Sequence, residues 1–237
     1  FGMLQFYFGQ KIFGSIGLDP KEKNMNEKFY KDWSHDLNWG IHQARCVVGH
    51  NLKVAWNLTR MHSLKPKESY KKFAHQIADA IPESGCDNQR GGWYDMMERT
   101  LKEGEENHRL VWHDRKAWWQ QEQGILAYYI MAGVYNDKPE YLNFAREGTA
   151  FYNGWFLDYE EGGIYFNVLA NGQPYSLGTE RGKGSHSMAG YHSFELCYLA
   201  AIYTNLLIKK QSMDFYFCPE PNGWEDNILK VAPDLLP

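Results

Sequence analysis

Two histidines of the chain each open an apolar segment, a position from which an imidazole can face a pocket. His50 follows Gly49 and precedes an apolar run, and His192 follows Tyr191 after a glycine-rich loop. Proton transfer beside a carbonyl needs a group that titrates near neutral pH, which histidine supplies without extreme tuning. The pair therefore indicates acid/base chemistry, although a lone histidine at a helix start is also the ordinary pattern of a cap or an interfacial residue.

Each histidine has a charged neighbour three positions later, on the same face of a helix. Lys53 follows His50 at this spacing, and Glu195 follows His192. Glu195 could orient the ring of His192 or raise its basicity. It could equally be a first-turn carboxylate that the helix dipole favours, and the sequence leaves both interpretations open.

Between the histidines lies an unusual run that begins with two tryptophans, Trp118 and Trp119, and ends with Glu122 and Gln123. Trp119 and Gln123 share a helix face, where an indole could stack on a sugar and an amide could bind its hydroxyls. Packing in the core is the competing interpretation for both tryptophans. We also expect His186, in the loop before the second histidine, to bind substrate.

Composition excludes several classes of partner. The net charge is −4, with 25 basic and 29 acidic residues spread along the chain, so neither a nucleic acid nor a membrane surface is indicated. The four cysteines and nine histidines show no metal-site spacing, and we expect neither a metal nor another cofactor. An aromatic share of 16% suits a pocket for a small neutral ligand such as a sugar.

Helical periodicity dominates the elements that must position these residues. The apolar pattern predicts five helices, at about residues 50–62, 68–81, 115–135, 140–156 and 189–208. Pro66 and Pro82 are expected to follow the first two as stops. The segment from Leu196 to Ile208 is apolar on nearly all sides, which predicts deep burial of the last helix.

Two segments with paired glycines, Gly91–Asp95 and Gly162–Phe166, lie 71 residues apart and look like equivalent positions of an internal repeat. Asn171 and Gly172 then predict a hairpin turn in the second copy. A repeat of two helices and a hairpin gives an all-α toroid with short β-hairpins at one rim. We expect one domain over residues 1–237, with the tail from Cys218 to Pro237 wrapping the surface.

The order of these motifs resembles the N-acylglucosamine 2-epimerase family, which includes cellobiose 2-epimerases and mannose isomerases. The series is Gly-His-x-x-x-x-Ala-Trp, Gly-Gly-Trp-Tyr, Trp-Trp-x-Gln, Gly-Gly with a hairpin, and Tyr-His, and it spans about residues 49–196. The resemblance implies an (α/α)6 barrel with its site at the loop-bearing end. Because the chain is shorter than the family's barrel, it implies the C-terminal portion of one.

By this resemblance His50 and His192 match the family's catalytic acid/base pair. Two positions depart from the family pattern: Lys53 and Gln123 each stand where the family has glutamate. Losing two anions should lower the pKa of the nearby histidines, and a lysine could stabilise the negative charge that develops on an enediolate oxygen. The departures put the substrate, or even the activity, in question.

The leading hypothesis is a cofactor-independent isomerase, either a sugar epimerase or an aldose–ketose isomerase, that moves a proton at C2 of a reducing sugar. His50 and His192 would transfer the proton, and Lys53, Trp118, Trp119, Gln123 and His186 would position the substrate. A glycoside hydrolase on the same toroid needs a carboxylate pair, for which Glu122 with Glu195 or Asp114 are the candidates. A silent carbohydrate-binding protein would bind sugar without turnover.

The first residue is Phe1, and the apolar stretch from Phe1 to Phe13 lacks the basic start and the cleavage site of a signal peptide. We therefore expect a cytoplasmic protein whose N-terminal part is missing from the sequence. No apolar stretch approaches the roughly 20 residues that span a bilayer. A homodimer remains open as its assembly.

Overall fold

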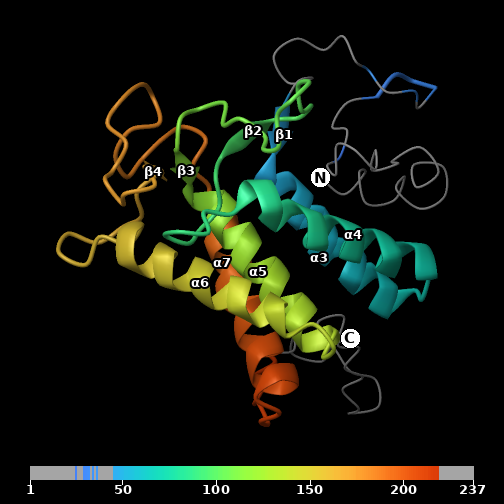
Figure 1. Cartoon of the computed structure of the whole chain (residues 1–237). Helices are drawn as coiled ribbons and strands as arrows, with labels where there is room; N and C mark the ends of the chain where they lie inside the picture. Colours follow the sequence, from blue (N-terminus) through green and yellow to red (C-terminus); the bar gives the residue numbers. More distant parts are fainter. Residues whose placement is uncertain (1–24, 26–28, 33, 35, 37–44, 219–237) are drawn as a thin grey trace, which may run out of the picture.

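The computed structural model describes residues 45–218, together with residues 25, 29–32, 34 and 36. Five α-helices and four short strands lie in this part of the chain (Figure 1). The segment Phe1–Phe13 and the whole tail after Cys218 lie outside the described residues. The helices are α3 (Val48–Leu64), α4 (Glu68–Gly85), α5 (Trp118–Val134), α6 (Pro139–Trp155) and α7 (Tyr191–Tyr203).

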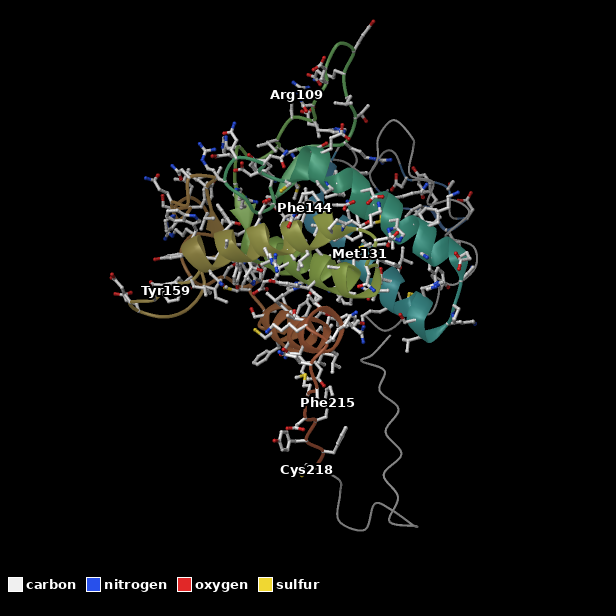
Figure 2. All side chains as sticks on the ribbon, turned by 60° about the horizontal axis from the view of Figure 1, so that its bottom comes forward. Arg109, Met131, Phe144, Tyr159, Phe215 and Cys218 are labelled. Atoms are coloured by element: carbon white, nitrogen blue, oxygen red, sulfur yellow. The ribbon has the colours of Figure 1, made fainter. Side chains whose placement is uncertain are left out.

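The helices are arranged in two layers. α3 packs against α4 and α5, and α5 packs against α6 and α7. α3, α5 and α7 therefore form one layer, which α4 and α6 cover from one side (Figure 1). Figure 2 shows Met131 and Phe144 within the packed helices, whereas Arg109 and Tyr159 lie on projecting loops. The five predicted helices are thus all present, with boundaries that differ by a few residues.

Two small antiparallel pairs cap one end of the inner helices (Figure 1). β1 (Arg45–Val47) pairs with β2 (Met96–Glu98), and β3 (Lys116–Ala117) pairs with β4 (Asn167–Val168). β1 runs directly into α3 and β3 into α5, so the pairs mark where both helices begin. The pairs join strands from neighbouring repeats, whereas simple hairpins were expected.

The first glycine pair closes a turn over residues 87–92. Both glycines have positive φ, and the Asp87 N–H donates to the Gly92 carbonyl over 3.0 Å. Lys116 Nζ donates to Asp87 Oδ2 at 2.8 Å and to the Gly91 carbonyl at 2.6 Å. A side chain at Gly92 would collide with Phe151, because a Cβ there would lie 2.7 Å from its ring.

The 158–163 turn repeats the 87–92 turn at the predicted offset of 71 residues. The Asp158 N–H donates to the Gly163 carbonyl over 3.1 Å, and both of its glycines again have positive φ. Lys183 Nζ donates to Asp158 Oδ2 at 2.7 Å and to the Gly162 carbonyl at 2.9 Å. The internal repeat is therefore confirmed in its hydrogen bonds. The turn expected at Asn171 and Gly172 is also present, with positive φ at the glycine alone.

α4 does not stop at Pro82, and that prediction is wrong. The helix continues through Pro82 to Gly85, although proline has no N–H for the Ala78 carbonyl. The Tyr128 hydroxyl donates to this carbonyl instead, at 2.8 Å. A side chain from the neighbouring helix α5 thus replaces the missing backbone hydrogen bond, which a pattern within one segment could not reveal.

α7 is also less buried than its composition predicts. Leu199, Ile202 and Tyr203 are buried, but Phe194 and Tyr198 are 78% and 51% exposed. The helix then widens into a π-helical turn over Thr204–Ile208, in which no residue is fully buried. The prediction of deep burial fails because, among the described helices, α5 is the main one that packs against α7, and it covers one side of it.

Candidate active site

A cavity of about 360 Å³ opens where α3, α5 and α7 begin. Its wall combines first-turn residues of these three helices with residues of the loops that precede them. Fourteen residues line it: His50, Lys53, Asp95, Met96, Arg115, Ala117, Trp118, Trp119, Phe166, Asn167, Glu180, Ser187, Tyr191 and His192. Both predicted histidines, Lys53 and both tryptophans are among them.

The two histidines occupy equivalent positions of the repeat. They are separated by two repeats of 71 residues, and each lies in the first turn of an inner helix. The indole of Trp119 contacts both, with its centroid 5.2 Å from the ring of His50 and 5.6 Å from that of His192. The two imidazoles therefore border one space within the reach of a monosaccharide.

His50 lies on the exposed side of the cavity. Its position is set by Gly49, whose N–H donates to Gln120 Oε1 at 2.6 Å. A Cβ on Gly49 would lie 2.7 Å from the side chain of Gln120 and 2.8 Å from the ring of Trp119. The Gly-His pair is thus needed for the close approach of α3 to α5.

His192 is buried, with 8% of its surface exposed. Its Nδ1 lies 3.1 Å from Nε2 of Gln123, and Trp118 contacts the ring edge-on at 6.0 Å between centroids. Burial, with smaller contributions from the positive charge of Lys53 and from His50, lowers the pKa of His192 to about 4. The lowering expected from the residue replacements is present, and burial is its largest cause.

Lys53 and Glu195 form an ion pair across α3 and α7, with Nζ 3.7 Å from Oε2 and both side chains about one quarter exposed. Glu195 also accepts a hydrogen bond from Gln123 Nε2 at 3.1 Å. No bond links Glu195 directly to His192 among the described contacts, so the carboxylate acts on the ring through Gln123. This favours the orienting role over that of a simple first-turn carboxylate.

Arg115 anchors a cluster that the sequence did not indicate. Its guanidinium binds the carboxylate of Asp95 through two nitrogens and contacts Glu180 at 3.4 Å. Asp95 is buried and also accepts from Gln120. The cluster joins the residues just before β2 and β3 to the loop between β4 and α7 and to α5, so the arginine is a cation whose charge is held in place.

Asn167 lines the cavity with a buried amide side chain. Its side chain is almost fully buried, its Nδ2 donates to the Glu180 carbonyl at 3.3 Å, and its Oδ1 has no hydrogen-bond partner in the described structure. A buried polar atom without a partner is costly, and this oxygen has almost no accessible surface. The sequence shows that Asn167 follows Met96 at the repeat offset of 71 residues. No feature of the sequence, however, indicates that the side chain of Asn167 lines the cavity.

Glu122 lies behind the cavity wall and does not line it. It is fully buried, and its Oε1 accepts from Ser193 at 2.6 Å and from Tyr152 at 2.7 Å. Burial raises its pKa to about 7, against the opposing effect of these two hydroxyls. The carboxyl is thus about half protonated at neutral pH.

Three predicted roles change in the structure. Gln123 is not in contact with the cavity but supports His192 from behind, and His186 is exposed and does not line the cavity. The carboxylates proposed for a hydrolase, Glu122, Glu195 and Asp114, also lie outside the lining. The lining carboxylates Asp95 and Glu180 are both engaged by Arg115.

Within the described part of the chain, no group of three potential ligand side chains could hold a metal ion. No helix in that part is long and apolar enough to cross a membrane.

Solved structures of sugar-converting proteins share this fold. A cellobiose 2-epimerase from Bacillus thermoamylovorans matches with a TM-score of 0.62 and 18% identity, over 81% of this chain and 44% of that one. D-mannose isomerase matches with 0.61 and 19%, over 81% and 44%. A cellobiose 2-epimerase from Spirochaeta thermophila matches with 0.65 and 17%, over 87% and 46%.

The predicted fold class is confirmed: the chain is mostly helical and forms part of a helical toroid. It spans less than half the length of these solved structures. At such identities the likeness concerns the fold alone. No protein-family model and no curated protein matches the sequence.

Proposed function

We propose that the protein is a cofactor-independent sugar isomerase or epimerase, related to the N-acylglucosamine 2-epimerase family, that moves a proton at C2 of a reducing sugar. One observation carries this proposal: His50 and His192 border one cavity, and Trp119 contacts both rings. The names of the solved structures with this fold, cellobiose 2-epimerase and D-mannose isomerase, support the same chemistry.

The charges around the cavity suit an enediolate intermediate. Removal of the C2 proton pushes electrons onto the carbonyl oxygen, and a fixed cation nearby stabilises that oxygen. Lys53 and Arg115 both line the cavity, and each is held by a carboxylate partner, Glu195 for the lysine and Asp95 for the arginine. The lysine thus adds a positive charge where the family pattern has a negative one.

The remaining lining suits a sugar ring. Trp119 is partly exposed and offers aromatic surface for the C–H face of a pyranose, whereas Trp118 is 3% exposed and packs on Phe166. Asn167 adds an amide to the lining. The volume of about 360 Å³ holds a monosaccharide, and the opening beside exposed His50 allows a further unit to project. A reducing mono- or disaccharide is therefore the proposed substrate class.

The decisive experiment is NMR of candidate sugars in D2O with the protein present. We would test mannose, glucose, N-acetylmannosamine and cellobiose, and expect deuterium at C2 of at least one of them. His50→Ala and His192→Ala should each slow this exchange by at least about 100-fold, in line with the loss of a general acid or base. His186→Ala is the matched control, since His186 is exposed and outside the cavity.

Exchange that survives in both cavity variants would refute proton transfer by these histidines. A silent sugar-binding protein is the second candidate, favoured by Lys53 and Gln123 at positions where the family has glutamate. It would show saturable sugar binding by calorimetry, lost in Asn167→Ala, with no deuterium incorporated. A hydrolase is disfavoured, because its candidate carboxylates lie outside the cavity lining.

A further inference from the structure

The amide of Gln123 joins three partners in the interior. The residue is fully buried on α5, and its Oε1 accepts from the indole N–H of Trp56 at 2.9 Å. Its Nε2 lies 3.1 Å from Glu195 Oε2 and 3.1 Å from His192 Nδ1. Gln123 thus connects all three inner helices directly behind one of the two cavity histidines.

The partners fix which way the amide points. An indole N–H can only donate, so the group that faces Trp56 must be the amide oxygen. A carboxylate can only accept, so the group that faces Glu195 must be the NH₂. Two independent partners on opposite sides therefore demand the same orientation of the Gln123 amide, and a flipped amide would lose both bonds.

This orientation decides the tautomer of His192. The NH₂ of Gln123 presents a hydrogen to Nδ1, so Nδ1 must accept and cannot itself carry a proton. The single proton of the neutral ring then resides on Nε2, the nitrogen left for the cavity that the ring lines. A glutamate at this position would do the reverse, since its carboxylate would accept a proton from Nδ1.

We propose that Gln123 is a positioning residue that locks His192 as the Nε2–H tautomer, so that His192 donates a hydrogen bond to the sugar and His50 is left as the base. The roles of His192 and His50 in the reaction rest on the proposed function, whereas the tautomer of His192 does not. In the proposed reaction His50 takes the C2 proton, and the C–H electron pair forms the C1–C2 double bond. The carbonyl pair moves to O1, which receives the hydrogen bond from Nε2.

The surroundings of His192 support the neutral form. Lys53 and His50 face it from α3, Glu122 approaches from α5 through Ser193, and Glu195 on its own helix is held by the lysine. Burial and the two basic groups of α3 lower the pKa of His192 to about 4, so the ring carries no charge at neutral pH. A neutral imidazole donates a hydrogen bond well but yields its last proton poorly.

A site with one base makes a specific product. The proton of the C2 hydroxyl passes to O1, and His50 returns its own proton to C1 on the face from which it came. The electron pair of the C1–C2 double bond forms the new C1–H bond, and the O2 pair forms the C2 carbonyl, which converts an aldose into a ketose. Epimerisation at C2 would need an acid on the opposite face, and a neutral His192 locked by Gln123 is a poor one. The geometry thus favours aldose–ketose isomerisation over epimerisation for the proposed activity.

The test of the lock is the imidazole nitrogen spectrum of the ¹⁵N-labelled full chain at pH 7, with the His192 signals identified by their loss in His192→Gln. We expect a protonated Nε2 and an unprotonated Nδ1. Gln123→Glu should move the proton to Nδ1 and raise the pKa of His192, and the matched Gln123→Met, which binds neither group, should give a tautomer mixture. A wild-type ring protonated on Nδ1, or a mixture there, overturns the proposal.

The product test then separates this inference from the proposed function. With mannose as the probe, we expect fructose to appear first, without glucose. Equal initial rates of fructose and glucose formation would overturn the one-base assignment even if the tautomer is as expected. If none of the tested sugars incorporates deuterium, the proposed function fails while the nitrogen spectrum still decides the role of Gln123.

Discussion

Glu122 and His192 lie near each other in the fold, and their pKa values are shifted in opposite directions. Their contributions to the pH dependence of folding stability therefore oppose each other. Burial raises the pKa of Glu122 from 4.5 to about 7. Burial, Lys53 and His50 lower that of His192 from 6.5 to about 4. Between pH 4.5 and about 7 the folded state holds a proton on Glu122 that the unfolded chain has lost. Between pH about 4 and 6.5 the folded state lacks a proton on His192 that the unfolded chain binds.

The signs follow from this proton count. The Glu122 contribution to stability falls as pH rises from 4.5 to 7, whereas the His192 contribution rises with pH from 4 to 6.5. Relative to wild type, Glu122→Gln should therefore gain stability with rising pH, and His192→Gln should lose it. Urea unfolding at pH 5, 6 and 7 measures both slopes, and three parallel profiles would contradict the shifted pKa values.

Single residues of the cavity were predictable where a motif marked them. His50, His192, Lys53, Trp118 and Trp119 were found from their order and from their positions at helix starts. Asp95, Arg115, Glu180 and Asn167 were not, because they come from separate loop and strand segments and act through partners far away in sequence. The sequence also carries a second mark of the repeat: an aspartate precedes each glycine pair at the same offset, Asp87 in the first turn and Asp158 in the second.

Among the elements, α4 depends on a hydrogen bond from outside itself. Tyr128→Phe removes the hydroxyl that serves the Ala78 carbonyl opposite Pro82, and leaving that carbonyl unpaired in the core should cost about 1–3 kcal/mol of unfolding free energy. The control is Tyr129→Phe, where Thr149 keeps its bond to the Ala145 carbonyl. Thermal and urea unfolding would measure both variants.

A double variant makes this prediction sharper. Pro82→Ala supplies a backbone N–H for Ala78, so it should cancel much of the loss caused by Tyr128→Phe. Additive effects of the two changes would show that the hydroxyl does not replace the proline's missing bond. Periodicity in the sequence was thus enough to predict that the helices form. It did not predict where α4 ends, since the residue that lets α4 continue past Pro82 lies on α5.

For the molecule as a whole, the exposed stripe of α7 is the largest departure from expectation. Phe194, Cys197, Tyr198 and Ala201 lie on one face of the helix, and all are exposed. Phe194→Ser should therefore change unfolding free energy by less than about 0.5 kcal/mol while raising solubility in ammonium sulfate. Ile202→Ser, on the buried face, should cost at least about 2 kcal/mol.

Comparable losses in the two variants would mean that the Phe194 face is covered in solution. The toroid itself was foreseen from the 71-residue repeat and the motif order, because these are properties of the whole pattern. Which face of α7 stays open was not foreseen, because its residues are apolar on both sides and only neighbouring helices distinguish them.

The 87–92 turn and the 158–163 turn differ in burial, so one side of the cavity is held less firmly than the other. Lys116 and Asp87 are 0% and 3% exposed, whereas Lys183 and Asp158 are 27% and 13% exposed. An ion pair that is exposed to water is easily broken. The segments that such a pair holds together therefore open before the core unfolds. Ser187, which follows Lys183, and Glu180, which precedes it, both line the cavity. If the protein has the proposed activity, sugar should enter and product leave past this second turn, and its opening rate should then set a ceiling on turnover.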